Sequence, residues 1–144
     1  LGVCNGFQIL VESGLLPGVL LKNDSLNFMC EWTNLTVENN KTPFTNKFEL
    51  NEKIPIPIAN GDGRYFVDDE TLKQLERKNQ IVFKYDQVVN GSSNQIAGVC
   101  NEDGNVVGMM PHPERAAEPE INPHDNKPSS LIFESLLKKI GANN

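Results

Sequence analysis

The sequence predicts an α/β domain, and three features of its pattern support that prediction. Short apolar runs rich in valine and isoleucine are mixed with amphipathic helical segments along the 144 residues. A cysteine flanked by glycines stands between a short apolar run and a helix, at Gly2–Gly6. Two further apolar runs flank the turn Asp103–Gly104, a pattern typical of a β-hairpin.

The first half of the chain is predicted to hold one short helix and several strands. A helix is expected at Asn5–Ser13, because apolar residues recur there at spacings of three and four and Gly14 can end it. The stretch Ile54–Ile58 is extended, but its prolines exclude a central, fully paired strand. The other elements predicted here are a strand at Val19–Lys22, strands within Asn27–Glu38 and a tight loop at Asn60–Gly63.

The second half of the chain is predicted to hold two longer helices. The first covers Asp68–Lys78, with Asp68 or Asp69 as its N-cap. The second covers Leu131–Ile140, with Ser129 or Ser130 as its N-cap, after a segment at 119–128 that is rich in proline and asparagine. The strands predicted here are Ile81–Tyr85 and the hairpin pair Ile96–Cys100 and Val106–Met110.

The composition is that of an ordinary globular chain. Hydrophobic residues make up 38% of it, charged residues make up 22%, and the formal net charge is −6. An acidic chain gives no electrostatic reason to expect nucleic acid or an anionic membrane as a partner. A membrane-spanning helix needs about 18 consecutive apolar residues, and no apolar run in the sequence approaches that length. No signal-peptide pattern is recognisable.

The three cysteines form no disulfide or metal-binding pattern. Cys4, Cys30 and Cys100 are an odd set without a Cys-x-x-Cys pair, which suits a reducing cytosol. We therefore expect a cytoplasmic protein whose own chain holds no metal. Glycosylation is not expected, because the eighteen asparagines make chance acceptor sequences common. These Asn-x-Ser/Thr sequences begin at Asn23, Asn34, Asn40 and Asn90.

The tetrapeptide Gly-Val-Cys-Asn occurs twice, and the residues that follow it distinguish the two cysteines. Cys100 is followed by a hairpin turn, whereas Cys4 is followed by Gly6 and a helix. Gly-x-Cys-x-Gly is the pattern of a nucleophile elbow, in which a side chain at either glycine is expected to collide. The helix N-terminus is expected to lower the pKa of the Cys4 thiol, and the Asn5 N–H to face an oxyanion. A buried structural cysteine is the alternative. Only Leu1–Val3 precede Cys4, so we expect the rest of its strand to lie upstream of this chain.

The chain offers two histidines as a base for that thiol. His124 lies in a polar loop and is expected to be a surface residue. His112 follows an apolar strand and stands between two prolines that restrict the backbone. Glu114 is near enough in sequence to orient the imidazole. A structural turn histidine is the alternative interpretation of His112.

Together, the motifs Gly2-x-Cys4-x-Gly6-x-Gln8 and His112-Pro-Glu114 resemble the class I (triad) glutamine amidotransferases. The resemblance covers nearly the whole chain and implies a three-layer, flavodoxin-like α/β domain. It implies that residues 1–144 are the C-terminal part of this single domain, without its N-terminal strands and a Gly-rich loop that supplies a second oxyanion-hole amide. Further stretches similar to the glutaminase subunits of phosphoribosylformylglycinamidine synthases are Gly14–Gly18, Ile56–Tyr65, Ile96–Gly98 and Gly108–Ala116.

The resemblance implies a glutaminase reaction with a catalytic triad. The Cys4 thiolate would attack the side-chain amide of L-glutamine, and His112 would protonate the departing ammonia. Glu114 would hold His112 while water hydrolyses the γ-glutamyl thioester. The substrate-binding groups that the resemblance implies are the Asn5 N–H, the Gln8 side chain and the backbone around Gly61 and Asp62.

The resemblance also implies a partner protein. A synthetase subunit would use the ammonia to convert formylglycinamide ribonucleotide to formylglycinamidine ribonucleotide in purine biosynthesis. ATP and Mg²⁺ would belong to that subunit, this chain would hold no cofactor, and the resemblance admits a small bridging subunit. The alternatives left open are another class I amidotransferase, a γ-glutamyl hydrolase, and an inactive fragment that serves as an interaction module. One departure stands at Asn60–Gly63, where family members often have His-Gly-Glu-Gly.

Overall fold

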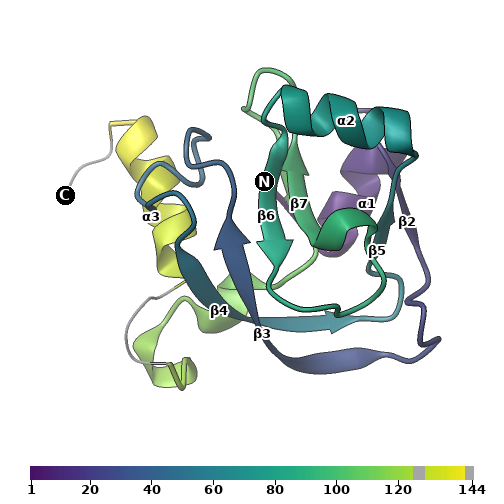
Figure 1. The fold of residues 1–144 in the computed structure, drawn as a ribbon. Helices are drawn as coiled ribbons and strands as arrows, with labels where there is room; N and C mark the ends of the chain where they lie inside the picture. Colours follow the sequence, from purple (N-terminus) through teal and green to yellow (C-terminus); the bar gives the residue numbers. More distant parts are fainter. Residues whose placement is uncertain (125–128, 142–144) are drawn as a thin grey trace.

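The computed structural model describes residues 1–124 and 129–141 and shows a curled β-sheet with helices on both sides (Figure 1). Its main sheet has six strands in the order β1–β8–β7–β6–β3–β4, and β2 and β5 form a separate pair. The strands are β1 Gly2–Val3, β2 Val19–Leu21, β3 Met29–Val37, β4 Lys53–Asn60, β5 Arg64–Phe66, β6 Ile81–Tyr85, β7 Ile96–Cys100 and β8 Val107–Met109. The α-helices are α1 Asn5–Glu12, α2 Asp69–Arg77 and α3 Ser130–Lys139, and short 3₁₀ turns cover Ser93–Gln95, Pro113–Ala116 and Pro119–Ile121.

Two hydrophobic clusters place the helices in separate layers. One cluster contains Phe7 and Val11 of α1 together with Leu75 of α2. The other contains Ile132 of α3 and the inward residues of the β3–β4 pair, such as Ile56. In Figure 1, α3 accordingly lies on the opposite side of the strands from α1 and α2. The predicted α/β class is therefore confirmed, with helices on both faces of one sheet.

The strand pairing brings the N-terminal strand β1 beside β8, the strand that precedes His112. β1 pairs in parallel with β8, so that Gly2 lies opposite Gly108. The other pairs of the main sheet are antiparallel. Since β1 and β8 run in the same direction, their carboxyl ends lie at the same edge of the sheet. Cys4 and the segment that leads to His112 leave the sheet at that edge.

Most elements predicted from the sequence are confirmed. The helix predicted at Asp68–Lys78 forms as α2, and the side chain of Asp68 caps it by accepting a hydrogen bond from the N–H of Thr71 at 2.7 Å. The hairpin predicted around Asp103–Gly104 forms from β7 and β8. The proline-containing strand β4 is an edge strand, as its prolines predicted. The stretch Asn27–Glu38 holds one long strand rather than several.

The predicted N-cap position of α3 is confirmed, but the hydrogen bond by which a serine side chain would cap the helix is absent among the described residues. Ser129 occupies the N-cap position, but its backbone is helical and its side chain makes no capping hydrogen bond. Its hydroxyl is buried without a partner among the described residues. The hydroxyl of Ser130 instead hydrogen-bonds Glu134 within the helix, at 3.1 Å. Residues 125–128 of the predicted proline-rich segment lie outside the described residues. None of the helices in the described residues is long and apolar enough to cross a membrane.

Candidate active site

Cys4 occupies a strained turn between β1 and α1. Its φ of 51° and ψ of −107° lie in a region that a residue with a side chain seldom adopts. A backbone held there costs about 1–3 kcal/mol and persists only where surrounding structure fixes it. Here the N–H of Cys4 donates to the carbonyl of Met109 at 2.9 Å, which continues the β1–β8 ladder by one residue. The turn therefore has the backbone strain expected of a nucleophile elbow.

Two glycines that lie opposite each other allow α1 to approach this turn closely. A Cβ on Gly2 would lie 2.6 Å from the carbonyl oxygen of Gly6 and 2.5 Å from the side chain of Leu10. A Cβ on Gly108 would lie 2.2 Å from the ring of Phe7. The collision expected at Gly6 is not found, because among the described residues no atom lies within 4 Å of a Cβ built there. Gly2, rather than Gly6, is the glycine that the close packing requires.

His112 and Glu114 form a close pair at the end of β8. The Nδ1 atom of His112 lies 2.6 Å from Oε1 of Glu114. The imidazole is 7% exposed, and its Nε2 atom is buried without a hydrogen-bond partner among the described residues. With Nδ1–H donating to the carboxylate, Nε2 is left with a free lone pair. The contact expected between Glu114 and His112 is thus present, and the imidazole can accept a proton at Nε2.

The edge strand β4 brings Cys4 and His112 to one place. The N–H of His112 donates to the carbonyl of Pro57 at 2.9 Å. The Sγ atom of Cys4 lies 3.9 Å from the carbonyl oxygen of Ala59. Carbonyls two residues apart in a strand point the same way, so Cys4 and His112 lie against the same edge of β4. His124, in contrast, is an exposed residue whose ring contacts Trp32 edge-on at 4.9 Å.

The expected lowering of the Cys4 pKa is not found. Burial raises the pKa of the Cys4 thiol above its ordinary value, and the negative charge of Glu114 adds to this effect. The backbone N–H of Asn5 and the charge of Arg115 act in the opposite direction without reversing the shift. The thiol is therefore mostly protonated at neutral pH, and it needs a base to become a nucleophile.

The second Gly-Val-Cys-Asn sequence occupies an inert position. Cys100 lies in β7 with 2% of its surface exposed, and burial raises the pKa of its thiol to about 11. Cys30 is exposed on β3, and it stands at neither a turn nor a helix end. Among the three free cysteines, Cys4 alone lies beside a histidine–carboxylate pair.

The predicted substrate-binding residues Gln8 and Asp62 are in contact. The Nε2 amide of Gln8, on α1, donates to the carbonyl of Asp62 at 3.0 Å. Gly61 and Asp62 form the turn that follows β4, and the exposed Asn5 begins α1. A hollow of about 710 Å³ opens beside the Gln8–Asp62 contact. It is lined by Gln8, Val11, Glu12, Gly18, Val19, Leu20, Leu21 and Asp62.

Two buried asparagines that no sequence motif singled out hold the turn at 60–63. Asn23 precedes β3, Asn90 follows β6, and both side chains are fully buried. In the sequence they stand out only as the first residues of two Asn-x-Ser/Thr sequences. Their burial makes them unsuitable as acceptors, and the only signal for their role was their position in polar loops between strands.

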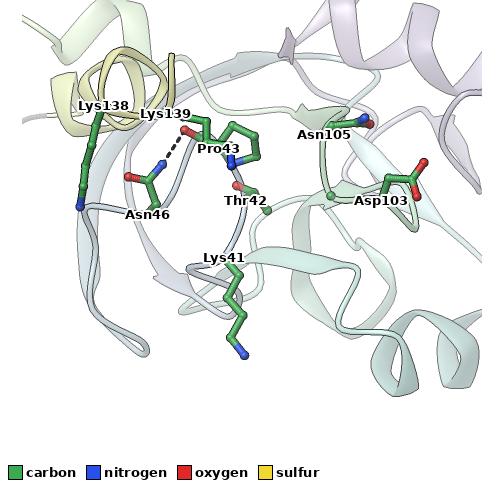
Figure 2. Close-up of a pocket in the computed structure, with 9 residues that line it drawn as sticks. Lys41, Thr42, Pro43, Asn46, Asp103, Asn105, Lys138 and Lys139 are labelled. Carbon is green, nitrogen blue, oxygen red and sulfur yellow. Dashed lines mark hydrogen bonds between the residues drawn. The ribbon is translucent and has the colours of Figure 1, made fainter. Parts of the chain in front are cut away.

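A second hollow lies away from these residues. Figure 2 shows this hollow, of about 410 Å³, between the loop at 41–46, the hairpin turn at 103–105 and the C-terminal end of α3. None of the candidate site residues lines it. In the described parts of the chain, no three His, Cys, Asp or Glu side chains gather in a way that could hold a metal ion.

Comparison with known proteins agrees with this geometry. Residues 1–138 match the CobB/CobQ-like glutamine amidotransferase domain family. The structure of PurLQS from Thermotoga maritima is 52% identical, with a TM-score of 0.83 over 96% of this chain and 60% of the matched chain. A crystal structure of a glutamine amidotransferase from Thermotoga maritima is 15% identical, with a TM-score of 0.52 over 96% of this chain and 55% of the other, and shows a likeness of fold alone. The chain thus spans 60% of the PurLQS chain that it matches.

Proposed function

Because the chain belongs to the family of CobB/CobQ-like glutamine amidotransferase domains, we propose that it hydrolyses glutamine through a thioester on Cys4. One observation carries the proposal. The strained Cys4 turn and the His112–Glu114 pair lie against the same edge of β4. A thiol, a base and a carboxylate that orients the base are the groups of a triad for acyl transfer.

The raised pKa of Cys4 makes the base essential to the proposed reaction. The Nε2 atom of His112 would accept the thiol proton as Sγ attacks the side-chain carbonyl carbon of glutamine. Glu114 would stabilise the imidazolium through its 2.6 Å contact with Nδ1. The N–H of Asn5, which already stabilises the thiolate form of Cys4, would donate to the developing oxyanion.

The second half of the reaction would use the same proton carrier in reverse. Collapse of the tetrahedral intermediate breaks the C–N bond, and the imidazolium of His112 gives its proton to the departing ammonia. Water then attacks the γ-glutamyl thioester, with Nε2 of His112 accepting a proton from it, and glutamate leaves as the Cys4 thiol is restored. Each step uses groups that this chain holds, apart from the second oxyanion-hole amide implied by the family resemblance.

A partner synthetase would consume the ammonia. PurLQS from Thermotoga maritima is the 52% identical relative on which this part of the proposal rests. Ammonia would pass to the synthetase subunit, which would bind ATP and Mg²⁺, and a small bridging subunit would join the two. A nucleophilic thiol must stay reduced, so the proposal places the complex in the cytoplasm.

The experiment that tests this function measures ammonia and glutamate released from glutamine by the intact protein. We expect slow release by the protein alone and faster release when its synthetase partner is added with ATP and Mg²⁺. The control is the synthetase supplied with an ammonium salt, which should form product without this protein. Equal release rates with and without the partner would contradict the proposal and favour a γ-glutamyl hydrolase.

A further inference from the structure

One buried residue, Asn23, makes hydrogen bonds to several backbone groups of the turn at 60–63. The Nδ2 amide of Asn23 donates to the carbonyl of Asn60 at 2.9 Å, and its Oδ1 atom accepts from the N–H of Gly63 at 3.0 Å. The backbone N–H of Asn23 donates to the carbonyl of Gly61 at 2.8 Å. The same Nδ2 also donates to the carbonyl of Asn27, so both of its hydrogens are used.

A second buried asparagine completes this set of bonds. The Nδ2 amide of Asn90 donates to the carbonyl of Gly63 at 2.7 Å. The carbonyl of Asn90 accepts a hydrogen bond from the N–H of Asp24, the residue after Asn23, at 3.2 Å. The Oδ1 atom of Asn90 accepts from the hydroxyl and the N–H of Ser92. The segments that carry the two asparagines are therefore joined to each other as well as to the turn.

The backbone groups of the turn are used unequally. The carbonyls of Asn60, Gly61 and Gly63 are taken by Asn23 and Asn90, and that of Asp62 by Gln8. The N–H groups of Gly61 and Asp62 have no hydrogen-bond acceptor in the described part of the chain. A turn whose carbonyls are all bound and whose adjacent N–H groups are free is suited to an anionic group such as a carboxylate.

We infer that Asn23 is a positioning residue that holds the turn at 60–63 so that the N–H groups of Gly61 and Asp62 can bind the carboxylate at the amino-acid end of glutamine. The inference rests on the proposed function. Asn23 would act on the substrate only through the turn, where it accepts a hydrogen bond from the N–H of Gly63. Asn90 holds the carbonyl of the same Gly63. The full burial of the Asn23 amide makes its bonds hard to replace, because water cannot take over for a missing donor.

The test compares two variants of the intact protein with its partner present. Asn23→Asp keeps the size of the side chain and the acceptor for Gly63 but removes the two Nδ2 donor bonds. We expect the KM for glutamine to rise about tenfold or more while kcat stays within about threefold. The substitution loosens the turn that binds the amino-acid end of glutamine, but it leaves the groups around the reacting amide unchanged. Asn34→Asp, an exposed substitution on β3 with the same charge change, is the matched control and should leave both constants unchanged.

A second readout separates positioning from loss of structure. Iodoacetamide alkylates Cys4 but lacks the α-carboxylate that the turn would bind. The rate of this alkylation should therefore be the same in Asn23→Asp and in the unsubstituted protein. An unchanged KM in folded Asn23→Asp would overturn the inference. A rise in KM accompanied by equally large falls in kcat and in the alkylation rate of Cys4 would also overturn it. If Asn23→Asp does not fold, Asn90→Asp, which removes the donor to Gly63, decides by the same measurements. Absence of glutamine hydrolysis by the unsubstituted protein would instead refute the proposed function itself, and the inference with it.

Discussion

Replacing Cys4 with alanine is expected to lower the glutaminase activity of the intact protein by at least about 10³-fold. Without Sγ there is no atom at the strained turn that can form the thioester. Cys100→Ala is the matched control, since it removes a thiol from the same Gly-Val-Cys-Asn sequence. The Cys100→Ala variant should retain activity. Its free energy of unfolding should fall by about 1 kcal/mol, because a buried sulfur atom is lost from β7. The measurement is glutamate formation at saturating glutamine.

The opposite pattern would refute the assignment of the nucleophile. If Cys4→Ala retained activity while Cys100→Ala lost it, the second Gly-Val-Cys-Asn sequence would have to hold the reactive thiol. Thermal unfolding of both variants shows whether a loss of activity reflects a loss of folded protein.

Replacing His112 with asparagine is expected to lower kcat by about 10²–10⁴-fold with little change in KM. The imidazole accepts the thiol proton and returns it to ammonia, but it does not contact the amino-acid end of the substrate in the proposed reaction. The raised pKa of Cys4 strengthens this expectation, because too little thiolate exists at neutral pH to react without a base. Steady-state kinetics with glutamine over a range of pH measures both constants.

His124→Asn serves as the control for this second prediction. His124 is exposed and contacts only Trp32 among the aromatic residues of the described chain, so the substitution should leave kcat unchanged. Equal losses in the two variants would show that His112 has no special role in proton transfer. A fall in activity at Glu114→Gln that is smaller than at His112→Asn would agree with a carboxylate that acts through the imidazole.

Local sequence predicted those parts of the site that depend on short stretches of chain. The turn at Cys4 follows from a strand, a cysteine and a helix in immediate succession. His112 and Glu114 are two residues apart, so their contact needs no distant segment. The prolines of β4 indicated an edge strand, because proline has no N–H and leaves gaps in the hydrogen bonds that a central strand needs on both sides.

Features that depend on distant segments could not be predicted in this way. A side chain at Gly2 is excluded by Leu10 and by the backbone of Gly6, whereas a Cβ built on Gly6 meets no such obstacle among the described residues. The pKa of Cys4 depends on its burial, which exceeds the effect of the nearby Asn5 amide. Asn23 and Asn90 are far from the turn at 60–63 in sequence, and only the folded chain brings their amides to its backbone.

The most direct test of the central claim is peptide mapping after reaction with a diazoketone analogue of glutamine. An electrophile at the position of the substrate amide should alkylate the atom that attacks it. We predict that the analogue labels Cys4, that excess glutamine protects it, and that His112→Asn slows the labelling. Labelling of Cys30 or Cys100 with Cys4 unmodified would contradict the proposed site.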